Sequence, residues 1–299
     1  MTQREIELTL DDIRELIGNA LVDQLPRNSE HSEQLVRAIA WGVLGGGKRL
    51  RGTLVYTVSE GFSTSNIAGA LDFAVAIELM HSYSLIHDDL PSMDDADLRR
   101  GKPSTHKKFG AAMATLAGDA LQALAFDVIA NSKYLSSPQI ARGCKVLAVA
   151  SGWRGMVGGQ AWDISDEQPV GSESELSQLH QAKTGEIFKA AILLGLIVGD
   201  QDLDPDTLEW GEKFGMKLGW VFQMVDDVID VTQSSDTTGK PALHDDKLGK
   251  ITYPQLLGME GTLERIECAR KELKQFLKEK DLENSLLDDL VWRCIDRVA

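Results

Sequence analysis

SNIAGALDFAVAIELMHSYSLIHDDL, residues 65–90, is the stretch that decides the fold class of this chain. Its residues are apolar and small along most of its length, with Glu78 and His81 as polar interruptions. We interpret this stretch as a long buried helix. The helix is expected to end by delivering two aspartates, Asp88 and Asp89, to the segment that follows.

A dense group of charged residues overlaps the end of this predicted helix. SLIHDDLPSMDDADLRRGKP, residues 84–103, places five aspartates, two arginines, a glycine and a lysine within twenty residues. So many like charges need positive charge among them, and Mg²⁺ commonly takes one or two carboxylates together with phosphate oxygens. Guanidinium forks also bind phosphate. The stretch therefore indicates a site for Mg²⁺ carrying a phosphorylated ligand, while a solvated acidic turn is the alternative left open by this stretch alone.

A second acidic cluster lies far along the chain, in the segment FQMVDDVID, and contains Asp226, Asp227 and Asp230. On an α-helix Asp226 and Asp230 would project from one face, about 40° apart around the axis. Two acidic segments that faced each other could hold a polyanion between them through metal ions.

The first cluster needs a break in the helix to present its carboxylates together. Asp88 and Asp94 would lie about 120° apart around an unbroken helix. Pro91 lies between them and is expected to end the regular helix, which would let Asp94 turn back toward Asp88.

The composition is that of an ordinary globular protein. The 299 residues contain no Pro/Gly/Ser-rich linker and no change of composition, so we expect one domain spanning residues 1–299. Apolar residues make up 43% and charged residues 26% of the chain, which is ample for a core. The net charge of −15 and the pI near 4.8 argue against nucleic acid or an anionic membrane as the main partner.

Cysteine usage and the N-terminus predict a cytoplasmic protein. Cys144, Cys268 and Cys294 are odd in number and widely spaced, which is typical of reduced thiols rather than of a disulfide framework or a zinc site. The N-terminal MTQREIELTLDD has early acidic residues and no apolar core of a secretory signal. Apolar runs such as residues 190–199 reach only about half the length of a membrane span.

Helical periodicity runs through the rest of the chain. Apolar residues recur at helical spacing, and no strand alternation of useful length appears. Ser172 and Glu175 have the spacing of a capping box. We therefore predict an all-α fold, with helices over residues 6–25, 35–44, 48–60, 65–90, 109–130, 138–152, 172–198 and 208–231 and from 254 onward.

Two glycine-rich segments have separate interpretations. GGGKRLR, residues 45–51, would suit an anion because free backbone N–H groups and the positive end of a helix point the same way. A helix–helix turn with solvated basic residues is the alternative, and the spacing is not that of a nucleotide P-loop. Gly158 and Gly159 are expected where two backbones approach closely.

Two polar residues on apolar helices are candidate ligand contacts. His81 lies seven residues before Asp88, on the same helical face, although a lone buried histidine is more often a core residue. Lys183 lies inside an apolar helix, where an unpaired ammonium is costly, so it either reaches the surface or faces an anion. Thr184 and Gly185 predict a local kink there.

GGGKRLR, ELMHSYSLIHDDLPSMDDADLRRGKPSTH, GGQAWD, HQAKTG, FQMVDDVIDV and GKITYP occur in this order. Together they resemble the short-chain trans-prenyl diphosphate synthases, and the bacterial-type farnesyl diphosphate synthases in particular. The resemblance covers at least residues 45–258. It implies an all-helical single domain of antiparallel helices around a deep central cavity, a homodimer, and a reaction that joins isopentenyl diphosphate to an allylic diphosphate.

The resemblance assigns roles to residues of this chain. The metal ligands, for three Mg²⁺ ions or for Mn²⁺ in their place, would be Asp88, Asp89, Asp94, Asp226, Asp227 and Asp230. The contacts to the allylic diphosphate would be Arg99, Lys183, Lys240 and Lys250. The contacts to isopentenyl diphosphate would be Lys48, Arg51, His81 and Arg100. The residues near the developing carbocation would be Thr184 and Gln223, which with Lys183, Asp88 and Asp226 form the expected catalytic set.

Product length in this family depends on what blocks the cavity below the first aspartate cluster. Tyr83 is the bulky residue at that position, with Ser84 beside it, and the insertion of Pro91 and Ser92 is typical of the short-chain type. The resemblance therefore implies the C15 product farnesyl diphosphate, with C10 and C20 products as alternatives.

Three residues depart from the family pattern: Gly52 replaces a usual proline, Leu243 a common glycine, and Ile251 a small residue. Leu243 and Ile251 bear on the closing of a loop over the diphosphates, and none of the three removes a charge that the mechanism uses.

Two other functions fit parts of the pattern. A terpene cyclase would need no second diphosphate site, against which Lys48, Arg51 and Arg100 argue. A non-catalytic subunit would be expected to have lost a metal ligand, whereas both acidic clusters are complete.

Overall fold

The computed structural model describes residues 8–62, 66–165, 170–199, 203–232 and 251–298. Its helices are α1 Leu10–Gln24, α2 Glu33–Leu44, α3 Leu50–Gly61, α4 Ile67–Asp88, α5 Thr105–Phe109, α6 Ala111–Ala130, α7 Ser137–Ser151, α8 Met156–Asp163, α9 Glu173–His180, α10 Glu186–Gly199, α11 Pro205–Thr232, α14 Tyr253–Glu279 and α15 Leu286–Ile295. The smaller elements are the π turn η1 Gln181–Gly185, the 3₁₀ turn η2 Asp296–Val298, and the strands β1 Leu98–Arg99 and β2 Lys102–Pro103.

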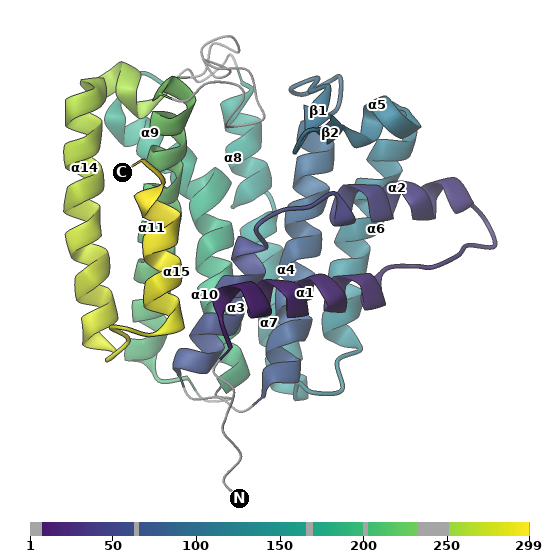
Figure 1. Ribbon diagram of the computed structural model, residues 1–299, viewed down its shortest axis with the longest axis horizontal. Coiled ribbons are helices and arrows are strands. Elements are labelled where there is room, and N and C mark those ends of the chain that lie inside the picture. The colour runs from purple at the N-terminus through teal and green to yellow at the C-terminus, as the bar shows by residue number, and fades with distance from the viewer. Residues whose placement is uncertain (1–7, 63–65, 166–169, 200–202, 233–250, 299) are drawn as a thin grey trace, which may run out of the picture.

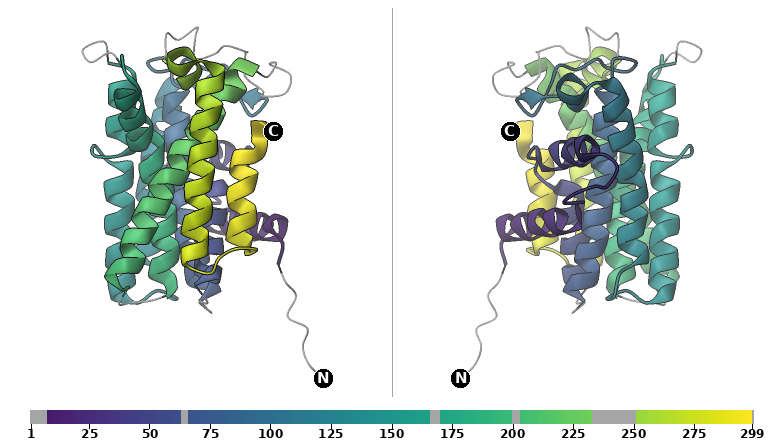
Figure 2. Two further views of the ribbon diagram at one scale, coloured as in Figure 1. Left: turned by 90° about the vertical axis from the view of Figure 1, so that its left-hand side faces the viewer. Right: turned by 90° about the vertical axis from the view of Figure 1, so that its right-hand side faces the viewer.

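The long helices run side by side, and α1 and α2 lie across one side of this bundle (Figure 1, Figure 2). Helix α4 packs against α3, α6 and α10, while α10 also packs against α7 and α11, and α11 packs against α14. The β1–β2 hairpin lies with α5 at one end of the bundle (Figure 1). The predicted all-α fold is confirmed, with this short hairpin as the part that helical periodicity did not predict.

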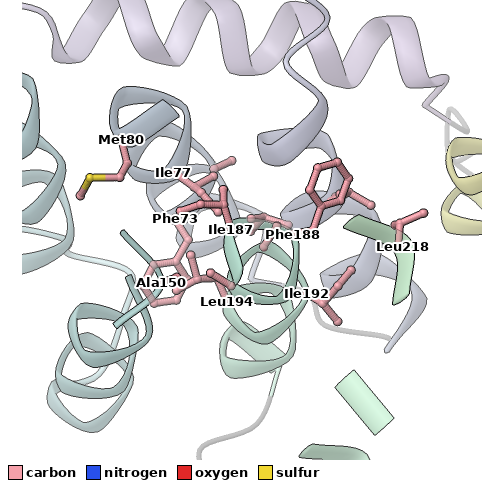
Figure 3. Close-up of a cluster of buried hydrophobic side chains, with 14 of the residues drawn as sticks. Phe73, Ile77, Met80, Ala150, Ile187, Phe188, Ile192, Leu194 and Leu218 are labelled. Atoms are coloured by element: carbon pink, nitrogen blue, oxygen red, sulfur yellow. The ribbon is translucent and has the colours of Figure 1, made fainter. Parts of the chain in front are cut away.

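Helix α10 forms the centre of the core because nearly all of its side chains after Glu186 are apolar. All of its residues from Ile187 to Val198 are buried except Lys189. Figure 3 shows side chains of α4, α7, α10 and α11 meeting here, among them Phe73, Phe188 and Leu218. A helix without a polar face is stable in water only when neighbours cover it completely, as they do in this bundle.

Local chemistry fixes where the predicted helices begin. Helix α1 begins at Leu10 because the side chain of Thr9 accepts a hydrogen bond from the Asp12 N–H and caps the helix. Helix α3 begins at Leu50 because Arg49 has a left-handed backbone, with φ of 48°. The predicted cap at Ser172 is confirmed, since its hydroxyl accepts a hydrogen bond from the Glu175 N–H.

Within the part of the chain described above, α6 alone is long and apolar enough to cross a membrane by length and composition. It packs along α4, and 39% of its apolar window is buried inside the bundle. Core helices of soluble proteins can have the same length and composition, so this finding does not by itself indicate a membrane span. The other side of α6 carries exposed apolar residues such as Leu116.

Candidate active site

A cavity of about 1130 Å³ opens among α3, α4, α8, η1 and α11. It brings together most of the side chains predicted from the sequence. Those that line it are Lys48, Arg51, His81, Tyr83, Ser84, Asp88, Asp94, Arg99, Arg100, Lys183, Thr184, Gln223, Asp226 and Asp230. Asp89 and Asp227 do not line it, and Lys240, Leu243 and Lys250 lie outside the described residues.

The first acidic cluster bends as Pro91 predicts. Helix α4 ends at Asp88, and the backbone N–H of Asp94 donates to the carbonyl of Asp88 at 2.9 Å. This hydrogen bond folds the chain back on itself, so both residues reach the same cavity although six positions separate them. The predicted break in the helix is therefore confirmed.

Asp89 points into the protein rather than into the cavity. Its side chain is only 3% exposed, and it accepts hydrogen bonds from Nε of Arg99 at 3.0 Å and from Nη2 of the same guanidinium. A bidentate arginine–carboxylate pair fixes both geometry and charge. Asp89 therefore positions Arg99, which itself lines the cavity.

In the second cluster, Asp226 and Asp230 reach the cavity from one face of α11, as the four-residue spacing predicts. Asp227 is 2% exposed and accepts a hydrogen bond from the N–H of Tyr253 at 3.0 Å. That bond ties α11 to the first residue of α14. Asp227 thereby fixes the orientation of α11 and of its two neighbouring carboxylates.

A chain of hydrogen bonds continues from Asp227 into the cavity. Nε2 of Gln223 donates to Asp227 at 3.3 Å, and Oε1 of Gln223 accepts from the Thr184 hydroxyl at 3.0 Å. Because the hydroxyl proton of Thr184 is committed to Gln223, the remaining lone pairs of that oxygen are left for other contacts. The network presents partial negative charge at the cavity wall without a free acidic proton.

Lys183 lies in the π turn η1, where the sequence predicts a kink. Its ammonium forms an ion pair with Asp163 at 2.7 Å, and its side chain is 29% exposed. Helix α8 can approach this turn closely because Gly159 has no side chain; a Cβ there would lie 2.4 Å from the backbone nitrogen of Lys183. The sequence predicted the close approach, and for Lys183 either the surface or an anion, but not that Asp163 would supply the anion.

The start of α3 is held by a buried carboxylate on α4. Glu78 is 2% exposed, accepts a hydrogen bond from the Gly52 N–H at 3.0 Å and lies 3.7 Å from the Arg49 guanidinium. The family pattern has a proline at position 52, and proline has no N–H to donate. The hydrogen bond to Glu78 is therefore possible because this chain has Gly52 there. Glu78 was interpreted only as a polar interruption, because its partners are distant in the sequence.

Replacing Glu78 by glutamine is expected to lower the free energy of unfolding by about 3 kcal/mol, because it removes the counter-charge of a buried arginine. The amide would still accept a hydrogen bond from Gly52, so the loss reports the charge. Urea unfolding of the variant measures it, with exposed Glu60→Gln on α3 as the matched control. Equal midpoints for the two variants would refute this role of Glu78.

His81 lines the cavity beside Arg51 and Arg100 and is itself neutral. Its Nε2 lies 3.1 Å from Nη1 of Arg51, whose guanidinium also lies over the Phe188 ring. Burial, followed by the charges of Arg51, Arg100, Arg99 and Arg49, holds the pKa of His81 well below its usual value. A neutral imidazole can accept the arginine N–H and so orient Arg51 toward the cavity.

Buried histidines are expected to make the fold acid-sensitive below pH 6.5. Burial lowers the pKa of His180 to about 3, because it outweighs the opposing charge of Asp163 and is reinforced by the positive charge of Lys183, and the pKa of His81 is lowered as well. Below pH 6.5 the unfolded chain binds these protons and the folded chain does not, so acid favours unfolding. Each histidine should contribute a loss of about 1.4 kcal/mol per pH unit until the folded pKa is reached.

Urea unfolding at pH 7 and at pH 5.5 checks this dependence. The variant His180→Asn should show a smaller loss of unfolding free energy over the same interval than the unchanged protein. An identical pH dependence in both proteins would exclude His180 as a source of the effect.

Arg100 lies against the glycine loop. Its guanidinium donates to the carbonyl of Gly46, and a Cβ at Gly47 would lie 2.6 Å from its central carbon. Gly46 and Gly47 have φ of 99° and 128°, a backbone that favours glycine. The glycines therefore let the loop close around an arginine, and Lys48 follows at the cavity wall.

Tyr83 lies on α4, five residues before Asp88, and lines the cavity below that carboxylate. It is 3% exposed and meets the His87 ring edge to face at 5.6 Å. Burial, with the nearby charge of Asp88, raises the pKa of Tyr83 to about 12, so the phenol stays neutral. Its ring is therefore buried in the wall of the cavity.

The oxygen donors fit a divalent cation that is shared with a ligand. Among the residues that the structure describes, no three acidic, histidine or cysteine side chains converge into a closed metal site. Carboxylates of the two clusters instead line one cavity together with lysines and arginines. Mg²⁺ bound through one or two carboxylates and phosphate oxygens needs this kind of open donor set.

Comparisons with known proteins agree with the geometry. The farnesyl diphosphate synthase of Escherichia coli is 43% identical over 274 residues, 88% of this chain and 89% of that protein. Geranylgeranyl pyrophosphate synthase 9 of Arabidopsis thaliana is 42% identical over 246 residues, 80% of this chain and 67% of that protein. A crystal structure of a Helicobacter pylori geranyltransferase, complexed with magnesium and isoprenyl diphosphate, superposes with a TM-score of 0.85 and 31% identity, covering 96% of this chain and 95% of that one.

The sequence pattern of the polyprenyl synthetase family matches residues 33–291, which include both acidic clusters and the cationic residues described above. A match of this extent, with 43% identity to a synthase over most of the length, shows that the chain belongs to the polyprenyl synthetase family and is a trans-prenyltransferase.

Proposed function

We propose that this protein condenses isopentenyl diphosphate with dimethylallyl or geranyl diphosphate to give (E,E)-farnesyl diphosphate. The observation that carries the proposal is the meeting of both acidic clusters and a set of cations around one cavity. Breaking an allylic C–O bond leaves a diphosphate anion and a carbocation, so the barrier falls when the leaving group is neutralised. We further propose that residues 1–299 form a single synthase domain.

The leaving group would be held from two sides. Asp88 and Asp94 on one side, and Asp226 and Asp230 on the other, would hold Mg²⁺, which supplies the positive charge that stabilises the departing diphosphate. We propose three Mg²⁺ ions per site, which Mn²⁺ can replace. Asp89 and Asp227 belong to the predicted set of metal ligands. Their contacts inside the fold support a further role, in which Asp89 positions Arg99 and Asp227 positions α11.

Fixed cations complete the neutralisation of the two diphosphates. Arg99 and Lys183 would contact the allylic diphosphate, with Lys240 and Lys250 as further predicted contacts. The second diphosphate would be bound by Lys48, Arg51, Arg100 and the neutral His81, which line the same cavity. Arginine does not lose its proton near neutral pH, so its charge does not vary during the reaction.

The carbocation needs a dry wall with weak dipoles. The hydroxyl of Thr184 already donates to Gln223, so its oxygen can stabilise positive charge and has no proton left to give. Apolar residues including Met156, Ile187 and Ile229 line the cavity and exclude water. The released diphosphate would accept the proton that leaves in the last step.

The farnesyl product rests on Tyr83 rather than on the comparisons, because synthases named for farnesyl and geranylgeranyl products are 43% and 42% identical to this chain. Tyr83 and Ser84 line the cavity, and the ring of Tyr83 would limit the depth available to the prenyl chain. A C15 chain is therefore proposed as the main product, with C10 or C20 as the alternatives.

A synthase test uses purified protein, Mg²⁺, isopentenyl diphosphate and dimethylallyl diphosphate, with the products sized by chromatography. We expect a C15 diphosphate, and no product when isopentenyl diphosphate is omitted. Incubation with farnesyl diphosphate alone should return it unchanged. Its conversion to a hydrocarbon would indicate a terpene cyclase instead.

We also propose that the protein is a homodimer in the cytoplasm. The side of α6 turned away from the bundle carries exposed apolar residues, and Leu116 is 52% exposed. A second copy would remove this surface from water. The free thiols of Cys144, Cys268 and Cys294 support a reducing compartment.

A further inference from the structure

The last turn of the described chain enters the proposed active site. Turn η2 follows α15, and the side chain of Arg297 lines the same cavity as Asp88 and Asp226. Arg297 was not among the residues singled out in the sequence, because its partner lies 71 positions earlier. Its position therefore follows only from the fold.

Arg297 forms an ion pair with Asp226 through Nη1 and Oδ1 at 2.7 Å. Its guanidinium lies 4.2 Å from the centre of the Phe222 ring, and its Nε donates to the carbonyl of Cys294 at 2.8 Å. The arginine side chain is 19% exposed and the aspartate 39% exposed. The pair is thus partly screened from water and held in one orientation by its neighbours.

A separate contact attaches the same turn to another helix. Asp296 forms an ion pair with Arg270 of α14, outside the cavity. Turn η2 therefore has a second attachment, through Asp296, besides the contacts of the Arg297 side chain. The contact between Arg297 and Asp226 pairs two opposite charges at the wall of the cavity.

We propose that Arg297 is a built-in counter-ion of Asp226, which a divalent cation has to displace when it binds the second acidic cluster. The inference rests on the proposed function, since it takes Asp226 as a metal ligand. In the metal-free protein the pair would limit repulsion between Asp226 and Asp230. When the cation takes its place at the carboxylate, the guanidinium is released within a cavity built for anions.

The competition can be measured without substrate or turnover. Titration of the metal-free protein with Mn²⁺ alone, following free Mn²⁺ by electron paramagnetic resonance, gives its affinity. Arg297→Gln is expected to bind Mn²⁺ about fivefold more tightly, the factor that a partly exposed ion pair contributes to an equilibrium constant. Arg293→Gln removes the same charge from an exposed site on α15 and should leave the affinity unchanged.

A double-mutant cycle separates direct competition from a general effect of charge. In the Asp226→Asn protein, Mn²⁺ binding should be weaker, and adding Arg297→Gln should change it no further. If Arg297→Gln alone leaves the affinity unchanged, or tightens it equally in both backgrounds, the counter-ion role is overturned while the metal site stands. If Asp226→Asn does not weaken Mn²⁺ binding, the metal site and the counter-ion role are both overturned.

Discussion

Replacing Asp88 by asparagine is expected to lower kcat/KM for condensation by on the order of a thousandfold, because it removes a carboxylate that we propose holds Mg²⁺ against the departing diphosphate. Asp88 lies at the end of α4 and lines the same cavity as Asp226 and Asp230 of α11. The asparagine side chain has the same shape, so the fold should be unaffected. Steady-state rates with saturating Mg²⁺ measure the effect.

The same substitution at Asp97 provides the control for this result. Asp97 lies in the loop that follows α4, but its side chain is 80% exposed and pairs with Lys107 rather than lining the cavity. Asp97→Asn should therefore keep its activity within about twofold, as expected for an exposed ion pair. Equal losses in both variants would mean that the loop, and not the Asp88 carboxylate, is what the reaction needs.

Replacing Tyr83 by alanine is expected to shift the main product from C15 to C20 or longer. The ring of Tyr83 is 3% exposed and lines the cavity below Asp88, so its removal deepens the space available to the prenyl chain. Extended incubation with isopentenyl and dimethylallyl diphosphates, followed by chromatography of the dephosphorylated products, measures the change.

Tyr83→Phe distinguishes the volume of the ring from the chemistry of its hydroxyl. Phenylalanine keeps the ring and its edge-to-face contact with His87, so this variant should still stop at C15. A Tyr83→Ala protein that also stops at C15 would show that another residue forms the floor of the cavity.

Helical periodicity was sufficient to predict the fold class and the approximate bounds of the helices, because apolar residues at helical spacing indicate which side of a helix packs against the core. It could not place the exact starts. Helix α3 begins two residues later than predicted because Arg49 has a left-handed backbone, a property that periodicity does not encode. Arg100 and Gly101 likewise have positive φ, which allows the tight β1–β2 turn.

The residues of the candidate site that lie within local sequence motifs could be predicted. Spacing placed Asp226 and Asp230 on one face, and the resemblance supplied the cations. The sequence could not predict ion-pair partners that only the fold brings together, such as Asp163 for Lys183 or Arg297 for Asp226.

Adjacent aspartates also proved to have different surroundings. The sequence gives Asp88 and Asp89 the same residue type, yet one reaches the cavity and the other is paired with Arg99 inside the fold. Successive residues on a helix point about 100° apart, so the environment of each depends on what packs against that side. Only the three-dimensional arrangement of α4, α11 and the β1–β2 hairpin settles which carboxylate faces which partner.

The condensation rate as a function of divalent cation tests the central proposal most directly. After removal of metals by EDTA, the purified protein should form no C15 diphosphate from isopentenyl and dimethylallyl diphosphates, and added Mg²⁺ should restore the reaction. Full turnover in the chelated protein would contradict the proposal that the two acidic clusters act by holding divalent cations against a diphosphate.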